Sequence, residues 1–358
     1  MKAVVLLGGE GTRLRPLTYT TPKQLLPVVE VALLERVLDH LAAGGVDEAI
    51  LSLGYRPDAF SAAYPDGVAS GIKLTYVVED SPLDTAGAIR FAARSAGVED
   101  TFVAVNGDVL TDLDVAALVA THRRRRALAT VHLTAVDDPS RFGVVEIDED
   151  GRVLAFVEKP PPGEAPSNLI NAGTYVLEPE VLGAIPGDRP VSIERETFPA
   201  LVPTGRVHAV PTDDYWLDAG TPAAYLRAHA DLLDGTRPGA PAPGARCASA
   251  GVWVLGSPRV EGEVRPYSLI GDAAAVSEGA VVESSVVGAG GRVDGGAVVR
   301  GSVLLPGAHV RAGATVTASV LGRGAVVGEE GEVCALSVVG DGEVLGRGVR
   351  LRAARVPA

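Results

Sequence analysis

Near its N-terminus the chain reads Leu7-Gly8-Gly9-Glu10-Gly11-Thr12-Arg13-Leu14-Arg15-Pro16-Leu17-Thr18, and it soon continues with Pro22-Lys23-Gln24-Leu25-Leu26-Pro27-Val28. The run before these glycines, residues 2–7, is apolar and predicts a β-strand. Glycines let backbone N–H groups approach a ligand that a Cβ would exclude, and two arginines and a lysine follow within the same stretch. Backbone N–H groups with fixed cations nearby suit a polyphosphate, so this stretch predicts a nucleotide held against the first strand.

Two better-known glycine loops do not fit this stretch. A Walker A loop ends in Gly-Lys-Ser/Thr, whereas this loop has Gly11-Thr12-Arg13. The dinucleotide fingerprint G-x-G-x-x-G would start at Gly9, but its third glycine would fall on Leu14. Both interpretations are therefore excluded.

The first two thirds of the chain alternate between short apolar runs and helical patterns. We predict strands at 2–7, 48–53, 72–78 and 101–105, and helices at 32–43, 56–63, 85–95, 112–124 and 222–234. Such alternation predicts an α/β fold, with a Rossmann-like, mixed but mainly parallel sheet covered on both faces. Ligands of such sheets lie at the carboxyl ends of the strands.

A second strand end also carries polar residues. Residues 101–105 are followed by Asn106-Gly107-Asp108. Mg²⁺ takes few protein carboxylates and many phosphate oxygens, so a carboxylate at a strand end is a candidate ligand. Alone the tripeptide could be a simple turn; beside the glycine-rich loop, Asp108 is a metal candidate.

The last third of the chain is repetitive. Residues 236–250 are rich in proline and glycine and predict a linker between a domain at 1–235 and one at 251–358. Aliphatic residues then recur every seventeen positions, in steps of six, six and five; one series is Ile270, Val287, Leu304, Leu321 and Val338. This pattern predicts the hexapeptide repeats of a left-handed parallel β-helix, with about four good coils and a fifth ending at Arg350. Before Ile270 the register is poor, with Trp253 in phase and Arg259 and Arg265 out of phase.

Composition narrows the classes of function. The net charge of −13 argues against a nucleic-acid partner and against an anionic membrane surface. Cys247 and Cys334 match no metal-ligand spacing, and no stretch is long enough to span a bilayer. These features predict a cytoplasmic protein.

The chain resembles the sugar-1-phosphate nucleotidyltransferases, and among them most closely the mannose-1-phosphate guanylyltransferases. The opening stretch matches their G-G-x-G-T-R-L-x-P-L-T and P-K-x-x-L-P-V motifs. Further matches, in the family's order, are Thr85-Ala86-Gly87-Ala88, Asn106-Gly107-Asp108, Phe142-Gly143-Val144-Val145, Phe156-Val157-Glu158-Lys159-Pro160, Asn171-Ala172-Gly173, Val191-Ser192-Ile193-Glu194-Arg195-Glu196 and Tyr215-Trp216-Leu217-Asp218-Ala219-Gly220-Thr221-Pro222. The C-terminal β-helix is also an architecture of that branch.

The resemblance implies Mg²⁺-dependent transfer of a nucleotidyl group from a nucleoside triphosphate to a sugar 1-phosphate, with release of pyrophosphate. The implied nucleotide-binding residues are Leu7, Gly8, Gly9, Gly11, Thr12, Arg13, Lys23, Gly87 and Asp108. The implied contacts to the sugar phosphate are Gly143, Glu158, Lys159 and Asn171. Catalysis falls to Arg13, Lys23, Asp108 and Lys159, and the metal to Asp108 and Asp218. A homo-oligomer is also expected, and the β-helix is expected to contact either a second subunit or the other domain.

Two departures from the family pattern bear on specificity. The usual Gly-Thr-Ala-Gly reads Asp84-Thr85-Ala86-Gly87, and a carboxylate there would either point away or alter base preference. A Lys-Pro before the first long helix is replaced by Val31-Ala32. Glu194 and Arg195 are open to a plainer interpretation as a surface helix pair. The alternatives are the same chemistry with another base or sugar (or cyclitol) phosphate, a non-catalytic regulatory relative that binds a sugar nucleotide, and a bifunctional enzyme whose β-helix transfers an acyl group through His309.

Overall fold

The computed structural model describes residues 1–357, which fold as two compact units. Unit 1 comprises Met1–Gly9 and Leu34–Trp216, and unit 2 comprises Glu10–Leu33 together with the chain from Leu217 onward. The glycine-rich loop therefore begins at the end of a strand of unit 1 and continues in unit 2. Each unit is described by itself below.

Unit 1 is built on a mixed sheet with the order β11-β10-β12-β7-β1-β4-β6-β5, in which β9 pairs with β12 and with β13. The four strands β7, β1, β4 and β6 run parallel to one another, as predicted for this part of the chain. The strands are β1 (Lys2–Leu6), β4 (Glu48–Leu53), β5 (Val68–Ala69), β6 (Ile72–Val78), β7 (Phe102–Asn106), β8 (Val109–Thr111), β9 (Ala129–Ala135), β10 (Gly143–Ile147), β11 (Val153–Glu158), β12 (Leu169–Leu177) and β13 (Val207–Thr212).

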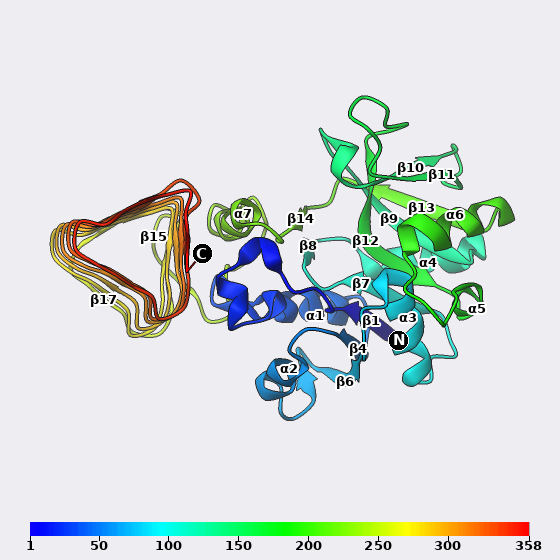
Figure 1. Ribbon diagram of the computed structural model, residues 1–358, viewed down its shortest axis with the longest axis horizontal. Coiled ribbons are helices and arrows are strands. Elements are labelled where there is room, and N and C mark those ends of the chain that lie inside the picture. The colour runs from blue at the N-terminus through cyan, green and yellow to red at the C-terminus, as the bar shows by residue number, and fades with distance from the viewer. Residues whose placement is uncertain (358) are drawn as a thin grey trace. The chain divides into compact units, whose positions relative to one another are not determined.

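The helices of unit 1 are α1 (Leu33–Ala43), α2 (Pro57–Ala63), α3 (Asp84–Ser95), α4 (Val115–Arg125), α5 (Val181–Ala184) and α6 (Phe198–Leu201), with a π-turn at Ile193–Thr197. Helices α1 to α4 (Figure 1) lie within a few residues of their predicted positions, whereas α5, α6 and the turn before α6 were not predicted. Helix α4 begins where Asp114 accepts a hydrogen bond from the Ala117 N–H at 2.8 Å. The core includes the fully buried rings of Phe102, Tyr175 and Phe198. No helix in the described chain is both long and apolar enough to cross a membrane.

Unit 2 contains a parallel β-helix, whose triangular coils are seen end-on in Figure 1. One face is formed by β15 (Arg246–Ser249), β16 (Val252–Val254), β19 (Ser268–Ile270), β22 (Val286–Val287), β25 (Val303–Leu304), β28 (Val320–Leu321), β31 (Val338–Val339) and β34 (Arg355–Val356). The second face is formed by β17 (Arg259–Val260), β20 (Ala275–Val276), β23 (Arg292–Val293), β26 (His309–Val310), β29 (Val326–Val327) and β32 (Val344–Leu345). The third is formed by β18 (Glu263–Val264), β21 (Val281–Glu283), β24 (Val298–Arg300), β27 (Thr315–Thr317), β30 (Glu332–Cys334) and β33 (Arg350–Arg352).

The remaining elements of unit 2 are short, apart from one helix. They are the 3-10 turns Thr12–Leu14, Leu17–Tyr19 and Lys23–Leu25, the antiparallel pair β2 (Pro27–Val28) and β3 (Val31–Ala32), β14 (Trp216–Asp218), which continues from unit 1, and α7 (Pro222–Leu233). Thr221 caps α7 by accepting a hydrogen bond from the Ala224 N–H at 3.2 Å, and Pro222 follows at the first helical position. The segment 236–250, predicted to be a linker, contains β15.

The register of the repeats departs from the predicted seventeen at both ends. Ile270, Val287, Leu304 and Leu321 pair in succession, but Leu321 then pairs with Val339 rather than Val338. The coil between β28 and β31 is one residue longer because its corner holds two consecutive left-handed residues, Ala335 and Leu336. The expected inward positions Val338 and Arg350 are therefore wrong: Val339 and Leu351 occupy the register of Leu321 and Val333.

A strict repeat of seventeen residues also assigns the wrong inward positions in the first coil. Val254, and not Trp253, pairs with Ile270, while Val260 pairs with Val276 and Val264 with Val282. The intervals are unequal there, which explains why Arg259 and Arg265 broke the pattern. In the described residues the second and third faces each hold six strands, so the stack has one coil more than expected.

A column of buried serines runs along one edge of the β-helix. Its members are Ser268, Ser285, Ser302, Ser319 and Ser337, none more than 1% exposed. The hydroxyl of each serine up to Ser302 accepts the backbone N–H of the next serine, at 3.4, 3.0 and 3.2 Å. Each such hydroxyl satisfies a buried backbone donor in the coil above it, which ties successive coils together.

Candidate functional site

The carboxyl ends of the parallel strands bring the start of the glycine-rich loop beside three other strand ends in unit 1. The Leu7 N–H donates to the Ser52 carbonyl at 2.9 Å, and the Gly107 N–H donates to the Leu6 carbonyl at 3.1 Å. A Cβ on Gly8 would lie 3.7 Å from Glu79 Oε1, and Gly9 has open space around its Cα. Gly8 and Gly9 therefore present exposed backbone at this edge, as predicted.

Asp108 is delivered to the same edge by β7. Its neighbour Gly107 is packed so tightly against Leu7 and Val5 that a Cβ there would overlap the Leu7 side chain. Because β1 and β7 are adjacent and parallel, Asp108 follows the strand end next to Gly8. The prediction that these two strand ends lie side by side is confirmed.

The residues expected on the sugar side converge on three adjacent strands. Gly143 of β10 is in register with Glu158 of β11, and Val144 pairs with Ile170 of β12, which places Asn171 beside Gly143. A Cβ on Gly143 would lie 2.8 Å from Glu158 Oε2 and 2.8 Å from the Phe156 ring. Glycine is required at position 143 because any side chain would displace this carboxylate.

Lys159 ends this cluster in a strained conformation. Its φ is +50°, a value that L-residues rarely adopt, and its N–H donates to the Phe142 carbonyl at 2.9 Å. Its Nζ lies 3.3 Å from Glu158 Oε1, and the Lys159 side chain is 65% exposed. A largely exposed ammonium on a fixed backbone is suited to meeting a phosphate.

Asn171 is held by a network below the strands. Its Nδ2 donates to the Tyr175 hydroxyl at 2.7 Å, and its Oδ1 accepts the Gly173 N–H at 3.0 Å. The pairing of β12 with β9 slips between Asn171 and Tyr175, an irregularity that re-aims side chains. Trp216 flanks the cluster, since its Nε1 donates to the Ala172 carbonyl at 2.9 Å and its ring meets Phe142 edge-on.

A carboxylate that the sequence did not place in the site lies next to this network. Glu194 accepts hydrogen bonds from Thr85 Oγ1 and from Ser192 Oγ, both at 2.9 Å. Burial raises the pKa of Glu194, and burial followed by the negative charge of Glu194 raises the pKa of Tyr175. The interpretation of Glu194 and Arg195 as a surface pair is wrong; the V-S-I-E-R-E motif was the signal available in the sequence.

Arg195 instead forms an ion pair with Asp84, the residue that stands where the family usually has glycine. Its Nη2 lies 2.8 Å from Asp84 Oδ2, and Asp84 Oδ1 accepts the Thr85 N–H at 2.7 Å. Asp84 has a φ of +59°, a backbone conformation that glycine adopts freely. Its carboxylate is therefore engaged at the start of α3. Gly87, in the next turn of α3, donates its N–H to the Val191 carbonyl at 3.1 Å.

In unit 2 the glycine-rich loop is closed around Gly11. Gly11 has a φ of +63°, and its carbonyl accepts hydrogen bonds from the Leu14 N–H and from Thr18 Oγ1, both at 2.9 Å. A Cβ on Gly11 would lie 2.9 Å from Thr18 Cγ2 and 3.1 Å from Lys23 Cβ. Gly11 therefore sets the position of Lys23, whose stem is buried, while Thr12 and Arg13 remain exposed in the turn that follows.

Arg13 and Asp218 also meet within unit 2. Arg13 Nη2 lies 3.7 Å from Asp218 Oδ2, and the Gly220 N–H donates to Asp218 Oδ1 at 2.9 Å. A Cβ on Gly220 would lie 2.6 Å from the Arg13 guanidinium and 2.7 Å from Asp218. Arg15 is bonded locally: its guanidinium lies 2.7 Å from Glu10 and over the Tyr19 ring.

The predicted residues therefore fall into two sets. Unit 1 carries Leu7, Gly8, Gly9, Gly87, Asp108, Gly143, Glu158, Lys159 and Asn171, and unit 2 carries Gly11, Thr12, Arg13, Lys23 and Asp218. Among the described residues no three His, Cys, Asp or Glu side chains form a ready metal cluster. Asp108 in unit 1 and Asp218 in unit 2 each carry a carboxylate, a type of ligand that suits Mg²⁺ together with phosphate oxygens and water.

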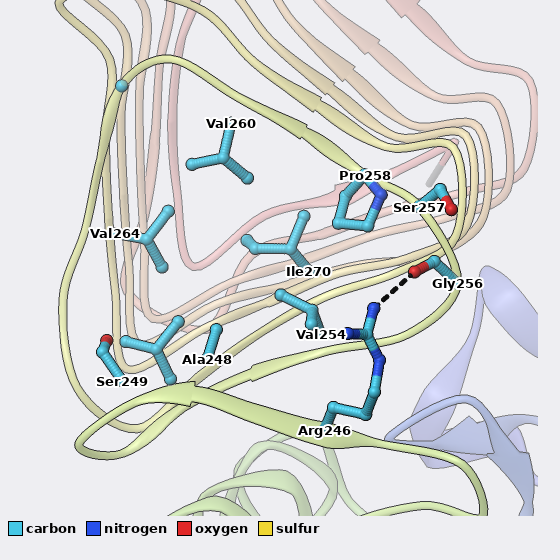
Figure 2. A pocket seen from close by; sticks show the side chains of 12 residues that line it. Arg246, Ala248, Ser249, Val254, Gly256, Ser257, Pro258, Val260, Val264 and Ile270 are labelled. Atoms are coloured by element: carbon cyan, nitrogen blue, oxygen red, sulfur yellow. Dashed lines mark hydrogen bonds between the residues drawn. The ribbon is translucent and has the colours of Figure 1, made fainter.

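A hollow at the open end of the β-helix is separate from these residues (Figure 2). Its volume is about 460 Å³, and its lining comes entirely from residues 246–270, including Val254, Val260, Val264 and Ile270. At its mouth Arg246 Nη2 donates to the Gly256 carbonyl at 3.0 Å (Figure 2). It contains none of the predicted site residues.

Comparisons with known proteins match both the N-terminal and the C-terminal parts of the chain. A nucleotidyl transferase family model matches residues 2–235, and a GMPPB C-terminal domain model matches residues 264–357. The chain is 42% identical over 281 residues to a mannose-1-phosphate guanylyltransferase of Mycobacterium tuberculosis, which covers 78% of this chain and 72% of that protein. It is 39% identical over 230 residues to a mannose-1-phosphate guanyltransferase of Aspergillus oryzae, covering 63% of this chain and 62%, less than two thirds, of that relative.

Solved structures show the same fold over the first part of the chain. HddC from Yersinia pseudotuberculosis is 31% identical with a TM-score of 0.55, covering 64% of this chain and 97% of that one. A UDP-glucose pyrophosphorylase from Acinetobacter baumannii is 24% identical with a TM-score of 0.57, covering 66% of this chain and 94% of that one, and shows the fold alone. From the family model over residues 2–235 and these likenesses we conclude that the chain belongs to the nucleotidyl transferase family.

Proposed function

We propose that the protein transfers a guanylyl group from GTP to mannose 1-phosphate, giving GDP-mannose and pyrophosphate. The observation that carries the proposal is the 42% identity to a mannose-1-phosphate guanylyltransferase over 78% of this chain. The presence of both family models, in order along the chain, supports it. The cluster of Gly143, Glu158, Lys159 and Asn171 in unit 1 supplies the polar groups that such a sugar phosphate requires.

In this reaction a phosphate oxygen of mannose 1-phosphate attacks the α-phosphorus of GTP. The bond from that phosphorus to the oxygen bridging to the β-phosphate breaks, and pyrophosphate leaves with the electron pair. No covalent enzyme intermediate is needed because the attacking phosphate is already ionised at neutral pH. Catalysis is therefore positioning of two anions together with neutralisation of their charge.

The roles follow from this requirement. The backbone of Leu7, Gly8, Gly9, Gly11 and Thr12 would receive the nucleotide, with Gly87 near the base. Arg13 and Lys23 would neutralise the triphosphate and the departing pyrophosphate, and Lys159 the phosphate of the sugar. Glu158 and Asn171 would accept and donate hydrogen bonds to sugar hydroxyls, with Gly143 leaving room for the sugar.

We propose Asp108 and Asp218 as the ligands of Mg²⁺. When bound, the ion neutralises phosphate charge at the reacting centre. Asp218 is already oriented by the Gly220 N–H, and Arg13 lies beside it, so the carboxylate and the guanidinium would act on the same triphosphate. Asp108 stands next to Gly8 at the strand ends.

Pyrophosphate release with Mg²⁺ tests the proposal directly. GTP, UTP, dTTP, ATP and CTP are crossed with a panel of sugar 1-phosphates and cyclitol phosphates. A dominant signal from GTP with mannose 1-phosphate is expected. Asp84 is held by Arg195, so its carboxylate should not change the preference for guanine. Turnover with a different pair overturns the substrate assignment, and silence with retained nucleotide binding overturns the enzymatic one.

We propose that the enzyme works in the cytoplasm, where such nucleotides and sugar phosphates circulate. We also propose that it is a homo-oligomer joined through its β-helix. Light scattering of the purified chain tests the assembly, and a clean monomer contradicts it. Cell fractionation tests the location.

A further inference from the structure

The glycine-rich loop is packed on the β-helix within unit 2. Residues 10–33 form one compact unit with α7 and the coils, although the loop is continuous with β1 of unit 1. The contacts that hold residues 10–33 to the coils therefore bear on where Arg13 and Lys23 lie.

One corner of the β-helix supplies those contacts. The residues at this corner, here called the corner row, are Asp272, Ala289, Pro306, Arg323 and Asp341. Backbone hydrogen bonds join successive members of the row. The residue that follows each of Ala289, Pro306, Arg323 and Asp341 donates its N–H to the backbone carbonyl of the preceding row member, at 2.8 to 3.0 Å. The row is thus a continuous edge with a fixed spacing.

The loop meets the corner row at two places. Thr20 Oγ1 donates to Asp341 Oδ2 at 2.6 Å, and Asp341 Oδ1 is itself oriented by the Arg323 N–H at 2.7 Å. In the turn between β2 and β3, Glu30 Oε2 accepts the Ala289 N–H at 3.2 Å. A Cβ on Gly288 would lie 2.8 and 2.9 Å from backbone atoms of Leu304 and Pro306 in the next coil and 3.0 Å from Glu30 Oε1, so the glycine lets both the coil and this carboxylate approach.

The turn that carries Glu30 is strained and is held from both sides. Val29 and Glu30 have φ values of +49° and +65°, and neither is a glycine. Such a backbone persists only where its surroundings determine it. The fully buried Val29 donates its N–H to His229 Nδ1 of α7 at 3.2 Å, while Tyr225 of α7 donates its hydroxyl to the Pro27 carbonyl.

We propose that Asp341 and Glu30 are positioning residues, through which the corner row of the β-helix fixes the loop that carries Arg13 and Lys23. Thr20 lies between the turns Leu17–Tyr19 and Lys23–Leu25, so Asp341 holds the segment that joins them. Glu30 holds the turn between β2 and β3, which follows Lys23–Leu25 in the chain. The inference rests on the proposed function, because it takes the loop that carries Arg13 and Lys23 to bind the triphosphate.

The variants Asp341→Ala and Glu30→Ala test this role in the full chain, with Asp272→Asn as the control. Asp272 belongs to the same row, but its carboxylate accepts the Ser257 N–H at 2.9 Å. We expect the Kd of GTP by calorimetry and the KM for GTP in pyrophosphate release to rise about tenfold in the first two variants. The KM for mannose 1-phosphate should stay unchanged, and Asp272→Asn should match the wild type in all three quantities.

A double-mutant cycle separates positioning from loss of stability. If Asp341 acts by holding Thr20, Thr20→Val and Asp341→Ala should raise the Kd of GTP to the same extent singly and together. Unchanged GTP affinity in folded Asp341→Ala and Glu30→Ala overturns the inference. An equal rise in the KM values for GTP and for mannose 1-phosphate in Asp341→Ala, Glu30→Ala and Asp272→Asn also overturns it. A wild type that binds GTP but releases no pyrophosphate refutes the proposed reaction, while the Kd values still decide the inference.

Discussion

The substitution Gly143→Ala tests whether the carboxylate of Glu158 must occupy its present position. The added Cβ would lie 2.8 Å from Glu158 Oε2 and 2.8 Å from the Phe156 ring. Ordinary van der Waals contact starts at 3.4 Å, so the Glu158 carboxylate and the buried Phe156 ring must each move by about 0.6 Å away from the new Cβ. A misplacement near 1 Å costs up to about 10²-fold, so we expect kcat/KM to fall by about 10- to 100-fold, or roughly 1.4 to 2.7 kcal/mol.

The loss should appear in the KM for mannose 1-phosphate and in kcat, with the KM for GTP unchanged, as measured by steady-state pyrophosphate release. Gly183→Ala is the matched control, because a Cβ on Gly183 has nothing within 4 Å. Thermal melting establishes that both variants are folded. A folded Gly143→Ala protein with wild-type kinetics would refute the placement of Glu158 against the sugar.

Three further results are expected. Gly11→Ala combines a strained φ of +63° with a Cβ 2.9 and 3.1 Å from two neighbouring side chains, so the KM for GTP should rise by about tenfold or more in steady-state assays. Ser302→Ala removes the acceptor of the buried Ser319 N–H, and should lower the free energy of unfolding by about 1–3 kcal/mol in chemical denaturation; no loss would contradict the role of the serine column. Burial, and then the charge of His40, lowers the pKa of His132 to about 4 from 6.5. Between those values the unfolded chain binds more protons, so stability is full above pH 6.5 and declines by about 3 kcal/mol as the pH falls to 4; His132→Gln should flatten that decline in unfolding measurements.

Much of unit 1 could be predicted because its elements depend on local sequence. The strands at 48–53 and 72–78 and the helices at 56–63 and 85–95 follow from apolar periodicity. The adjacency of Gly8 and Asp108 follows from the rule that parallel strands end at one edge. Which side chain a glycine makes room for is a different matter, because it depends on packing across strands, as at Gly143 and Glu158.

The remainder depended on contacts between distant segments. Nothing in the local pattern around Glu30 indicates that its carboxylate accepts the Ala289 N–H. The Arg195 contact with Asp84 joins residues far apart in sequence and reverses the expected pairing with Glu194. In the repeats, a single additional corner residue shifted the register after Leu321, and a periodic series cannot reveal where its own period changes.

The spacing of the corner row restricts how the β-helix can vary in length. The anchors at Ala289 and Asp341 are three coils apart, about 14 Å at strand spacing. Inserting or deleting one coil between them would alter that separation by about 4.8 Å, more than a hydrogen bond can follow. Coils outside the interval carry no such restriction. The two anchors therefore fix the number of coils between them. Coils beyond the anchors can be added or removed without changing the distance from Ala289 to Asp341.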